Sequence, residues 1–306
     1  MKFSEQVDVY LARSAARKRS PLKPTSIAAV RSQIRAALPV LGHLNLEDIN
    51  SGTLKDLAAF LDREKYSASS IHSILTAVKQ VVASDLDANG DPKHPCKWNN
   101  DFIDARPVRE RKKEVPTATE IQDALAVLES PIREFMATQA ASGCRLGELL
   151  ALNVSDFDSR GGLLRITRTL SRHGETSTKT EAGNRNVDLH PDIVSMLKIM
   201  LAGRTAGRLF SVTIDGARGA FNRVGIKSHS LRHFRYTLLR KANVHPTIHY
   251  YWIGHVLKGM AAIYDHTEED IKLRQRIVRE VGLGFTLPVF AAPQPAERQQ
   301  AIEATA

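Results

Sequence analysis

The chain has 306 residues, enough for two domains and a sizeable core, and its 42% hydrophobic and 25% charged residues are ordinary for a globular protein. Its formal net charge of +10 at pH 7 favours an anionic partner, either nucleic acid or a membrane surface. The sequence has no apolar run near the roughly 20 residues that span a bilayer, no signal-peptide core, and no P-loop or Gly-rich dinucleotide motif, so we expect neither a membrane partner nor a nucleotide cofactor.

The first part of the chain, residues 3–87, has the apolar spacing of four short helices. They begin near Phe3, Pro24, Leu54 and Ser67, with apolar side chains recurring at three- and four-residue intervals. Between the first two helices lies a basic cluster, made of Arg13, Arg17, Lys18, Arg19 and Lys23. Such a cluster either grips the phosphate backbone of a duplex or is a solvated loop, and the sequence leaves both interpretations open.

Residues 88–116 interrupt this helical pattern with turn-forming residues and then with the charged stretch RPVRERKKEVP. We therefore predict an N-terminal helical domain at residues 1–103, a basic linker at 104–116 and a second domain at 117–290. The last residues, 291–306, have the composition of a disordered tail.

The second domain is predicted to be mainly helical. Helices are expected from Thr117, where Thr117 and Glu120 have capping-box spacing, over 131–142, and just after Gly143. Between residues 161 and 189 the apolar period changes to two, which predicts one small antiparallel sheet of two or three strands, with Lys179 near the tip of its last hairpin. Further helices are expected at 191–201, about 212–224, from His229, and from Pro246 to near Gly254. The predicted class is mainly α with a small antiparallel β-sheet.

Two places in this domain suit an anion. Arg145 follows Gly143 at the start of a helix, and Glu148 lies one turn later, where it either orients Arg145 or pairs with it at the surface. Further along, residues 204–258 contain ten Lys or Arg against one acid, Asp215. Within that stretch His229 and Arg232 lie one helical turn apart, so both side chains share a side and suit a bound phosphate.

We expect neither cysteine to bind zinc. Only Cys96 and Cys144 are present, far apart in sequence, which indicates a reducing cytoplasm and no disulfide framework. A zinc site through His245 and His249, spaced i and i+4, is a remaining alternative, although the sequence offers no further converging ligands.

Five short motifs occur in a fixed order. They are SGCRLGE with Arg145, TKTEAGNR with Lys179, HSLRH with His229 and Arg232, IGH with His255, and AIYDHT with Tyr264. In this order and at these separations they resemble the tyrosine recombinase (phage integrase) family, and the resemblance covers both domains. The four N-terminal helices are similar in arrangement to the family's SAM-like core-binding domain.

This resemblance implies a site-specific DNA recombinase, and it implies a role for each motif residue. Arg145 and Arg232 would neutralise the charge that grows on a scissile phosphate, and His255 would form a hydrogen bond with the phosphate. Tyr264 would be the nucleophile, and His229 would accept or share its proton.

The remaining implications concern the leaving group and the partners. Lys179 would protonate the departing 5′ oxygen, leaving a 3′-phosphotyrosyl link that needs neither metal nor ATP, so no cofactor is expected. The expected partners are a double-stranded DNA recombination site, three further copies of the chain in a homotetramer, and accessory DNA-bending or directionality proteins, all in the cytoplasm. Residues 271–290 form a basic amphipathic segment that either docks on a neighbouring protomer or packs on its own domain. A type IB topoisomerase-like enzyme and a non-catalytic DNA-binding protein are the alternative functions.

Overall fold

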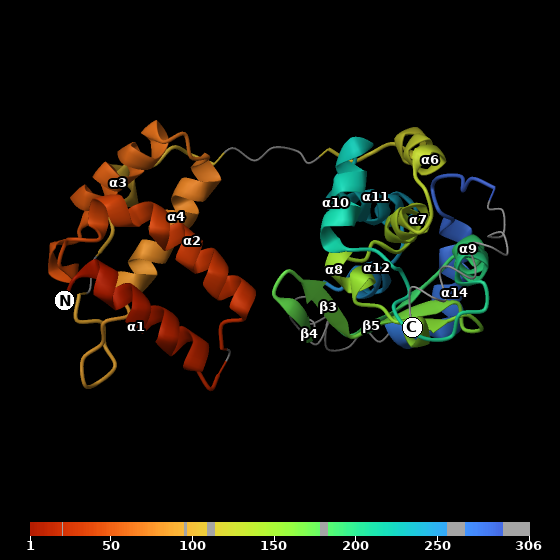
Figure 1. Cartoon of the computed structure of the whole chain (residues 1–306), viewed down its shortest axis with the longest axis horizontal. Helices are drawn as coiled ribbons and strands as arrows, with labels where there is room; N and C mark the ends of the chain where they lie inside the picture. The colour runs from red at the N-terminus through yellow and green to blue at the C-terminus, as the bar shows by residue number, and fades with distance from the viewer. Residues whose placement is uncertain (20, 95–96, 109–113, 178–182, 256–266, 290–306) are drawn as a thin grey trace. The chain divides into compact units, whose positions relative to one another are not determined.

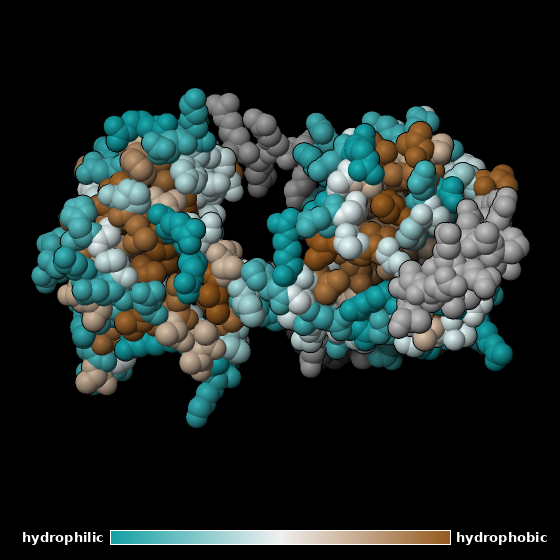
Figure 2. Space-filling view, viewed as in Figure 1, coloured by the Kyte–Doolittle hydropathy of each residue, from teal (hydrophilic) through white to brown (hydrophobic). Residues whose placement is uncertain are grey.

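The computed structural model describes residues 1–306 except 20, 95–96, 109–113, 178–182, 256–266 and 290–306 (Figure 1). The chain divides into two compact units, Met1–Arg111 and Lys112–Ala306. Each unit buries its own hydrophobic cluster. On the face shown in Figure 2, each unit displays hydrophilic residues with apolar residues among them. Among the described residues, no helix combines the length and apolar character needed to cross a membrane.

The predicted domain boundaries stay predictions. Part of the predicted linker at 104–116 and the whole of the predicted tail at 291–306 lie outside the described residues.

The N-terminal unit contains the four predicted helices, α1 (Phe3–Ala16), α2 (Pro24–Leu41), α3 (Ser51–Arg63) and α4 (Ala68–Val82), with the short elements η1 (Leu46–Asp48) and α5 (Asn100–Ile103) (Figure 1). Their apolar faces meet in one core in which Phe3, Leu54 and Val78 are fully buried. Ser67 caps α4 by accepting a hydrogen bond from the backbone nitrogen of Ser70 at 3.1 Å. The apolar spacing therefore predicted this unit correctly.

The second unit is mainly helical, which confirms the predicted class. Its helices are α6 (Ala118–Val127), α7 (Ile132–Ser142), α8 (Leu146–Leu150), α9 (Pro191–Leu201), α10 (Ile214–Arg223), α11 (Ser228–Lys241), α12 (Pro246–Ile253) and α14 (Ile271–Val281), with the 3-10 turns η2 (Val154–Asp156) and η4 (Thr267–Glu269). The predicted capping box is present, since the backbone nitrogen of Thr117 donates to Glu120 Oε2 at 2.7 Å and the backbone nitrogen of Glu120 donates to Thr117 Oγ1 at 3.2 Å.

The strands form two small sheets where the sequence predicted one. Strands β1 (Phe157–Asp158), β2 (Leu163–Ile166) and β5 (Arg185–Asp188) make an antiparallel sheet in the order β1-β2-β5, with Leu164 opposite Val187. Strands β3 (Arg168–Ser171) and β4 (Gly174–Ser177) make a separate hairpin. Strands β1 and β5 occupy both edges of β2, and within the described residues β3 pairs with β4 alone. A period-two pattern cannot distinguish these two pairings.

Helix α14 packs on its own unit in this single chain, and docking of residues 271–290 on a neighbouring protomer stays a prediction. Arg274 and Val278 on this helix are each 3% exposed. Asp270 caps its first turn by accepting from the backbone nitrogen of Leu273 at 2.9 Å. The chain then turns back at Gly282, and Phe285 packs against Phe234 of α11, with ring centroids 6.1 Å apart.

Candidate active site

Arg145 stands at the N-cap of α8, because Gly143 ends α7 in a left-handed conformation at φ 69°. An added Cβ at Gly143 would lie 2.6 Å from Ile253 Cδ1, so the close packing of α12 also requires glycine here. The guanidinium of Arg145 donates to Glu148 Oε1 at 2.7 Å and to the Gly254 carbonyl at 3.3 Å. Its side chain remains 46% exposed and is therefore accessible to a ligand from solution.

Arg232 reaches the same place from helix α11, but it is only 4% exposed. Its Nη1 donates to the Gly143 carbonyl at 2.9 Å, whereas its buried Nη2 has no hydrogen-bond partner among the described residues. Burial, followed by the charge of Arg145 and then that of Arg185, lowers the pKa of Arg232 to about 10. A buried cation with an unused donor favours an anion as its missing partner.

Arg185 completes a cluster that the sequence did not predict. Its side chain is fully buried, and it donates to Glu148 Oε2 at 2.9 Å and to the Trp252 carbonyl at 2.8 Å. Burial alone would raise the pKa of Glu148, but the charge and hydrogen bonds of Arg185, together with those of Arg145, hold it below its ordinary value. Two guanidinium groups therefore pair with the Glu148 carboxylate, and with Arg232 close by the cluster has a net positive charge.

A signal for Arg185 was present in the sequence. Val187 and Leu189 alternate as inward-facing residues, and the same alternation extended by two positions includes Arg185. An arginine on the buried face of a strand requires an acidic partner, and Glu148 fills that need.

The predicted histidines have different positions around this cluster. His255 follows α12 directly after Gly254, and partial burial, then the charges of Arg232, Arg145 and Arg185, lower its pKa. The imidazole of His255 is therefore neutral at pH 7. His229 lies on α11 one turn before Arg232, and its ring meets that of His233 edge to face with centroids 4.6 Å apart. The structure thus brings Arg145, Arg232 and His255 together.

Lys179 and Tyr264 lie outside the described residues. Lys179 falls in the sequence between β4 and β5, and Tyr264 falls between α12 and α14. Their predicted roles stay predictions.

The zinc alternative through His245 and His249 finds no added ligand in the described part of the chain, where no group of three or more His, Cys, Asp or Glu side chains is arranged for a metal ion. His249 is instead a buried residue whose Nδ1 lies 3.2 Å from the Val244 carbonyl.

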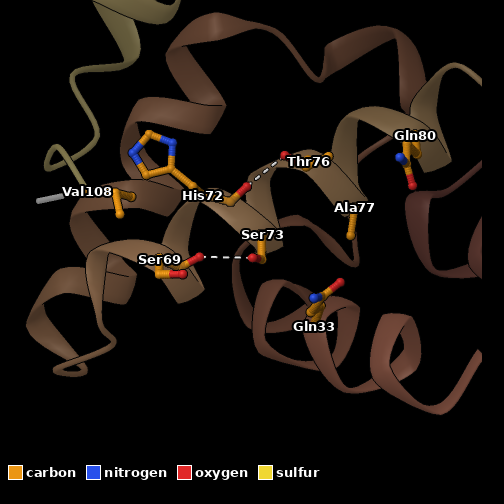
Figure 3. Close-up of a pocket in the computed structure, with 8 residues that line it drawn as sticks. All are labelled: Gln33, Ser69, His72, Ser73, Thr76, Ala77, Gln80 and Val108. Atoms are coloured by element: carbon orange, nitrogen blue, oxygen red, sulfur yellow. Dashed lines mark hydrogen bonds between the residues drawn. The ribbon is translucent and has the colours of Figure 1, made fainter. Parts of the chain in front are cut away.

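The N-terminal unit carries a second candidate surface, which we call the α4 stripe. Ser69, His72, Ser73, Thr76 and Gln80 are all exposed along one side of α4, and Gln33 on α2 borders the same hollow (Figure 3). Ser73 and Thr76 use their hydroxyl hydrogens within the helix, donating to the carbonyls of Ser69 and His72 at 2.9 and 2.8 Å. Their oxygens remain able to accept. The α4 stripe is therefore a row of polar, hydrogen-bonding side chains on one helix.

Comparison with known proteins adds one sequence relative and several structures. No protein-family model matches the chain. The integrase of Staphylococcus phage L54a is 28% identical over 180 residues, which cover 47% of this chain. The matched region covers 50% of that integrase, so the chain spans about half the length of the curated relative it matches.

The similar structures are integrases. The Tn1549 transposon integrase in complex with a circular intermediate DNA aligns over 100% of both chains, with a TM-score of 0.69 and 15% identity. The lambda integrase dimer bound to a COC′ core site has a TM-score of 0.56 and 21% identity, covering 86% of this chain and 95% of that one. The lambda integrase tetramer bound to a Holliday junction has a TM-score of 0.57 and 20% identity, covering 85% and 79%. The chain therefore shares the fold of these integrase structures, and part of its sequence is similar to that of a phage integrase.

Proposed function

We propose that the chain is a site-specific DNA recombinase that cuts and rejoins DNA strands through a 3′-phosphotyrosyl intermediate. The observation that carries this proposal is the pair of guanidinium groups of Arg145 and Arg232, one exposed and one buried with an unused Nη2. A phosphodiester presents two anionic oxygens to such a pair, and arginine forks bind these oxygens with two hydrogen bonds each.

The same pair accounts for the stabilisation of the transition state. When a nucleophile adds to phosphorus, negative charge grows on the non-bridging oxygens, and preorganised cations in a partly buried site stabilise it. Glu148 and Arg185 fix the position of Arg145 before the substrate arrives. His255, neutral at pH 7, donates a hydrogen bond to the same phosphate in this proposal.

The proposed covalent step uses Tyr264, His229 and Lys179. The phenol oxygen of Tyr264 forms a bond to phosphorus while its proton passes to His229, and the bond from phosphorus to the 5′ oxygen breaks. Lys179 gives that oxygen a proton, so each strand break ends in a 5′ hydroxyl and a 3′-phosphotyrosyl bond. Because the bond energy is conserved, a 5′ hydroxyl from another duplex reverses the step and joins a new partner.

The proposed substrate is double-stranded DNA. The net charge of +10 supports it, as do the DNA complexes of the similar integrases. In the N-terminal unit the basic cluster at Arg13, Arg17, Lys18, Arg19 and Lys23 would contact phosphates, and the α4 stripe would face base edges in a groove. A homotetramer is the proposed working assembly, supported by the lambda integrase tetramer on a Holliday junction, with accessory DNA-bending or directionality proteins as further proposed partners in the cytoplasm.

The experiment that tests this function must separate three activities. The purified chain is incubated with two labelled duplexes that carry its site, and with a supercoiled plasmid that carries one site. A recombinase exchanges strands between the duplexes and leaves a denaturation-resistant protein–DNA adduct at the site. Relaxation of the plasmid without strand exchange would indicate a topoisomerase, and sequence-selective binding without any adduct would indicate a non-catalytic DNA-binding protein. Either of these results would contradict the proposal.

A further inference from the structure

Asp188 connects the two sides of the segment that contains Tyr264. Its Oδ2 accepts a hydrogen bond from Trp252 Nε1 at 2.7 Å and another from Arg274 Nε at 2.7 Å. Trp252 belongs to α12, before that segment, and Arg274 belongs to α14, after it. We call these three residues the Asp188 fork.

All three residues of the Asp188 fork are buried. Trp252, Asp188 and Arg274 are 2%, 3% and 3% exposed. Asp188 Oδ1 has no hydrogen-bond partner among the described residues, so both hydrogen bonds converge on the other carboxylate oxygen. Removing a carboxylate and a guanidinium from water is costly, and two apolar side chains would stabilise the fold at least as well. The cost of the pair suggests a task other than stability.

The guanidinium of Arg274 also holds the backbone near the proposed nucleophile. Its Nη1 donates to the carbonyl of Glu268, and its Cζ lies 5.1 Å from the ring centre of Tyr251. Glu268 is four residues after Tyr264 in the sequence. A chain of four residues spans at most about 14 Å, so Arg274 fixes an anchor within that distance of Tyr264.

We propose that Asp188 is a positioning residue that holds the two flanks of the Tyr264-bearing segment together on one carboxylate oxygen. This inference rests on the proposed function, in which Tyr264 attacks the phosphate held by Arg145 and Arg232. Trp252 is close to that site, because its carbonyl accepts from Arg185, which also contacts Glu148. The fork therefore ties the anchor of Tyr264 to the same elements that position the arginines.

Two variants test the fork. Trp252→Phe removes one donor and keeps an aromatic ring. The double variant Asp188→Asn with Arg274→Met removes both charges together, so that neither is left buried without its partner. The matched control is Asp215→Asn with Arg172→Met, which removes an ion pair of 2.6 Å in the same unit whose side chains are 73% and 64% exposed.

Three quantities are measured for each variant: the affinity for a site-bearing duplex, the single-turnover rate of adduct formation, and the fluorine NMR spectrum of chain labelled with 3-fluorotyrosine. The chain has six tyrosines, and loss of one resonance in Tyr264→Phe identifies the signal of Tyr264. Tyr10 and Tyr66, in the N-terminal unit, provide reference signals.

If the fork positions the nucleophile, both variants form the adduct about 10- to 100-fold more slowly, as expected for a misplaced reacting group. Their duplex affinity then stays within about threefold, and the Tyr264 resonance changes while those of Tyr10 and Tyr66 do not. The control behaves as wild type.

The inference is overturned if adduct formation and the Tyr264 resonance both remain as in wild type. It is also overturned if rate and affinity fall together while the Tyr264 resonance is unchanged, because that pattern indicates a purely structural role. If the wild-type chain itself forms no adduct, the proposed function fails, and the Tyr264 resonance still decides whether the fork positions that residue.

Discussion

At the level of single residues, Arg232 is positioned to bind an anion, and this position lowers the stability of the free protein. The cation is buried close enough to Arg145 and Arg185 for their charges to lower its pKa, while Glu148 pairs with both of those arginines. In the free protein this arrangement is unfavourable, since one donor is unused and the charges repel. A bound phosphate supplies the missing negative charge.

Arg232→Met should therefore be at least as stable as wild type, because it removes a desolvated charge and keeps the length of the side chain. Adduct formation should fall by about 100- to 1,000-fold, the usual effect of losing one donor to a developing oxyanion. Urea unfolding gives the stability and single-turnover assays give the rate. A loss of more than about 2 kcal/mol in the unfolding free energy would mean that Arg232 is chiefly a structural residue.

A second residue gives a pH dependence. Burial lowers the pKa of His249 below its ordinary 6.5, and the charges of Arg240 and His245 act in the same direction. The hydrogen bond to Val244 opposes this shift without cancelling it. Above pH 6.5 the folded and unfolded chains are both neutral at this residue. As the pH falls below 6.5 the unfolded chain takes up the proton first, so the unfolding free energy decreases until the pH passes the folded pKa.

His249→Phe should weaken this dependence, whatever its effect on stability at pH 8. The measurement is urea unfolding of both proteins at pH 8.0, 6.5 and 5.5. Identical losses of unfolding free energy between pH 6.5 and 5.5 would show that His249 does not titrate differently in the two states.

At the level of elements, the ends of the helices position the site. Gly254 ends α12 at φ 67°, and a Cβ there would lie 2.7 Å from Arg185 Nη1. Position 254 thus requires glycine for two reasons. The backbone is left-handed there, and Arg185 packs too close for a side chain.

Gly254→Ala should lose both stability and adduct formation, whereas Gly225→Ala should lose only stability. Gly225 has a similar φ of 71° and open space around it, so its substitution costs about 1 to 2 kcal/mol of backbone strain and nothing more. Gly254→Ala introduces the same backbone strain and should also displace Arg185 from Glu148. Equal effects of the two substitutions on unfolding and on adduct rate would remove the packing argument.

The α4 stripe makes a separate prediction about sequence preference. His72→Ala should relax the preference at one or two adjacent base pairs, with about 1 to 3 kcal/mol less discrimination, because a side chain that reads base edges is lost. Selection of bound duplexes from a random pool measures this. Ser4→Ala, an exposed substitution on α1, is the control and should leave the preferred sequence unchanged. Weaker binding with the same preference would limit His72 to backbone contacts.

At the level of the whole molecule, the sequence predicted local patterns but not long-range contacts. The spacing of apolar residues was sufficient for the four N-terminal helices and for the helices from α7 to α12, because each of these patterns lies within one element. Arg145 and Arg232 were predicted from ordered motifs. The contacts of Arg185 with Glu148 and of Asp188 with Trp252 and Arg274 were missed, because they join residues 37 to 86 positions apart and a single sequence does not reveal such pairings. The separate β3-β4 hairpin was missed for a similar reason, since the alternation of apolar and polar residues predicts a strand but not which strand it pairs with.

The central claim is that the cations of Arg145 and Arg232 turn the phenol of Tyr264 into a strand-breaking group. The most direct measurement traps the adduct on a duplex with a nick close to the site, digests it with protease and nuclease, and maps the modified peptide by mass spectrometry. We predict a nucleotide phosphate on Tyr264, at the 3′ end of the cut strand, and no adduct from Tyr264→Phe. A phosphate found on another residue, or adduct formation that persists in Tyr264→Phe, would contradict the account.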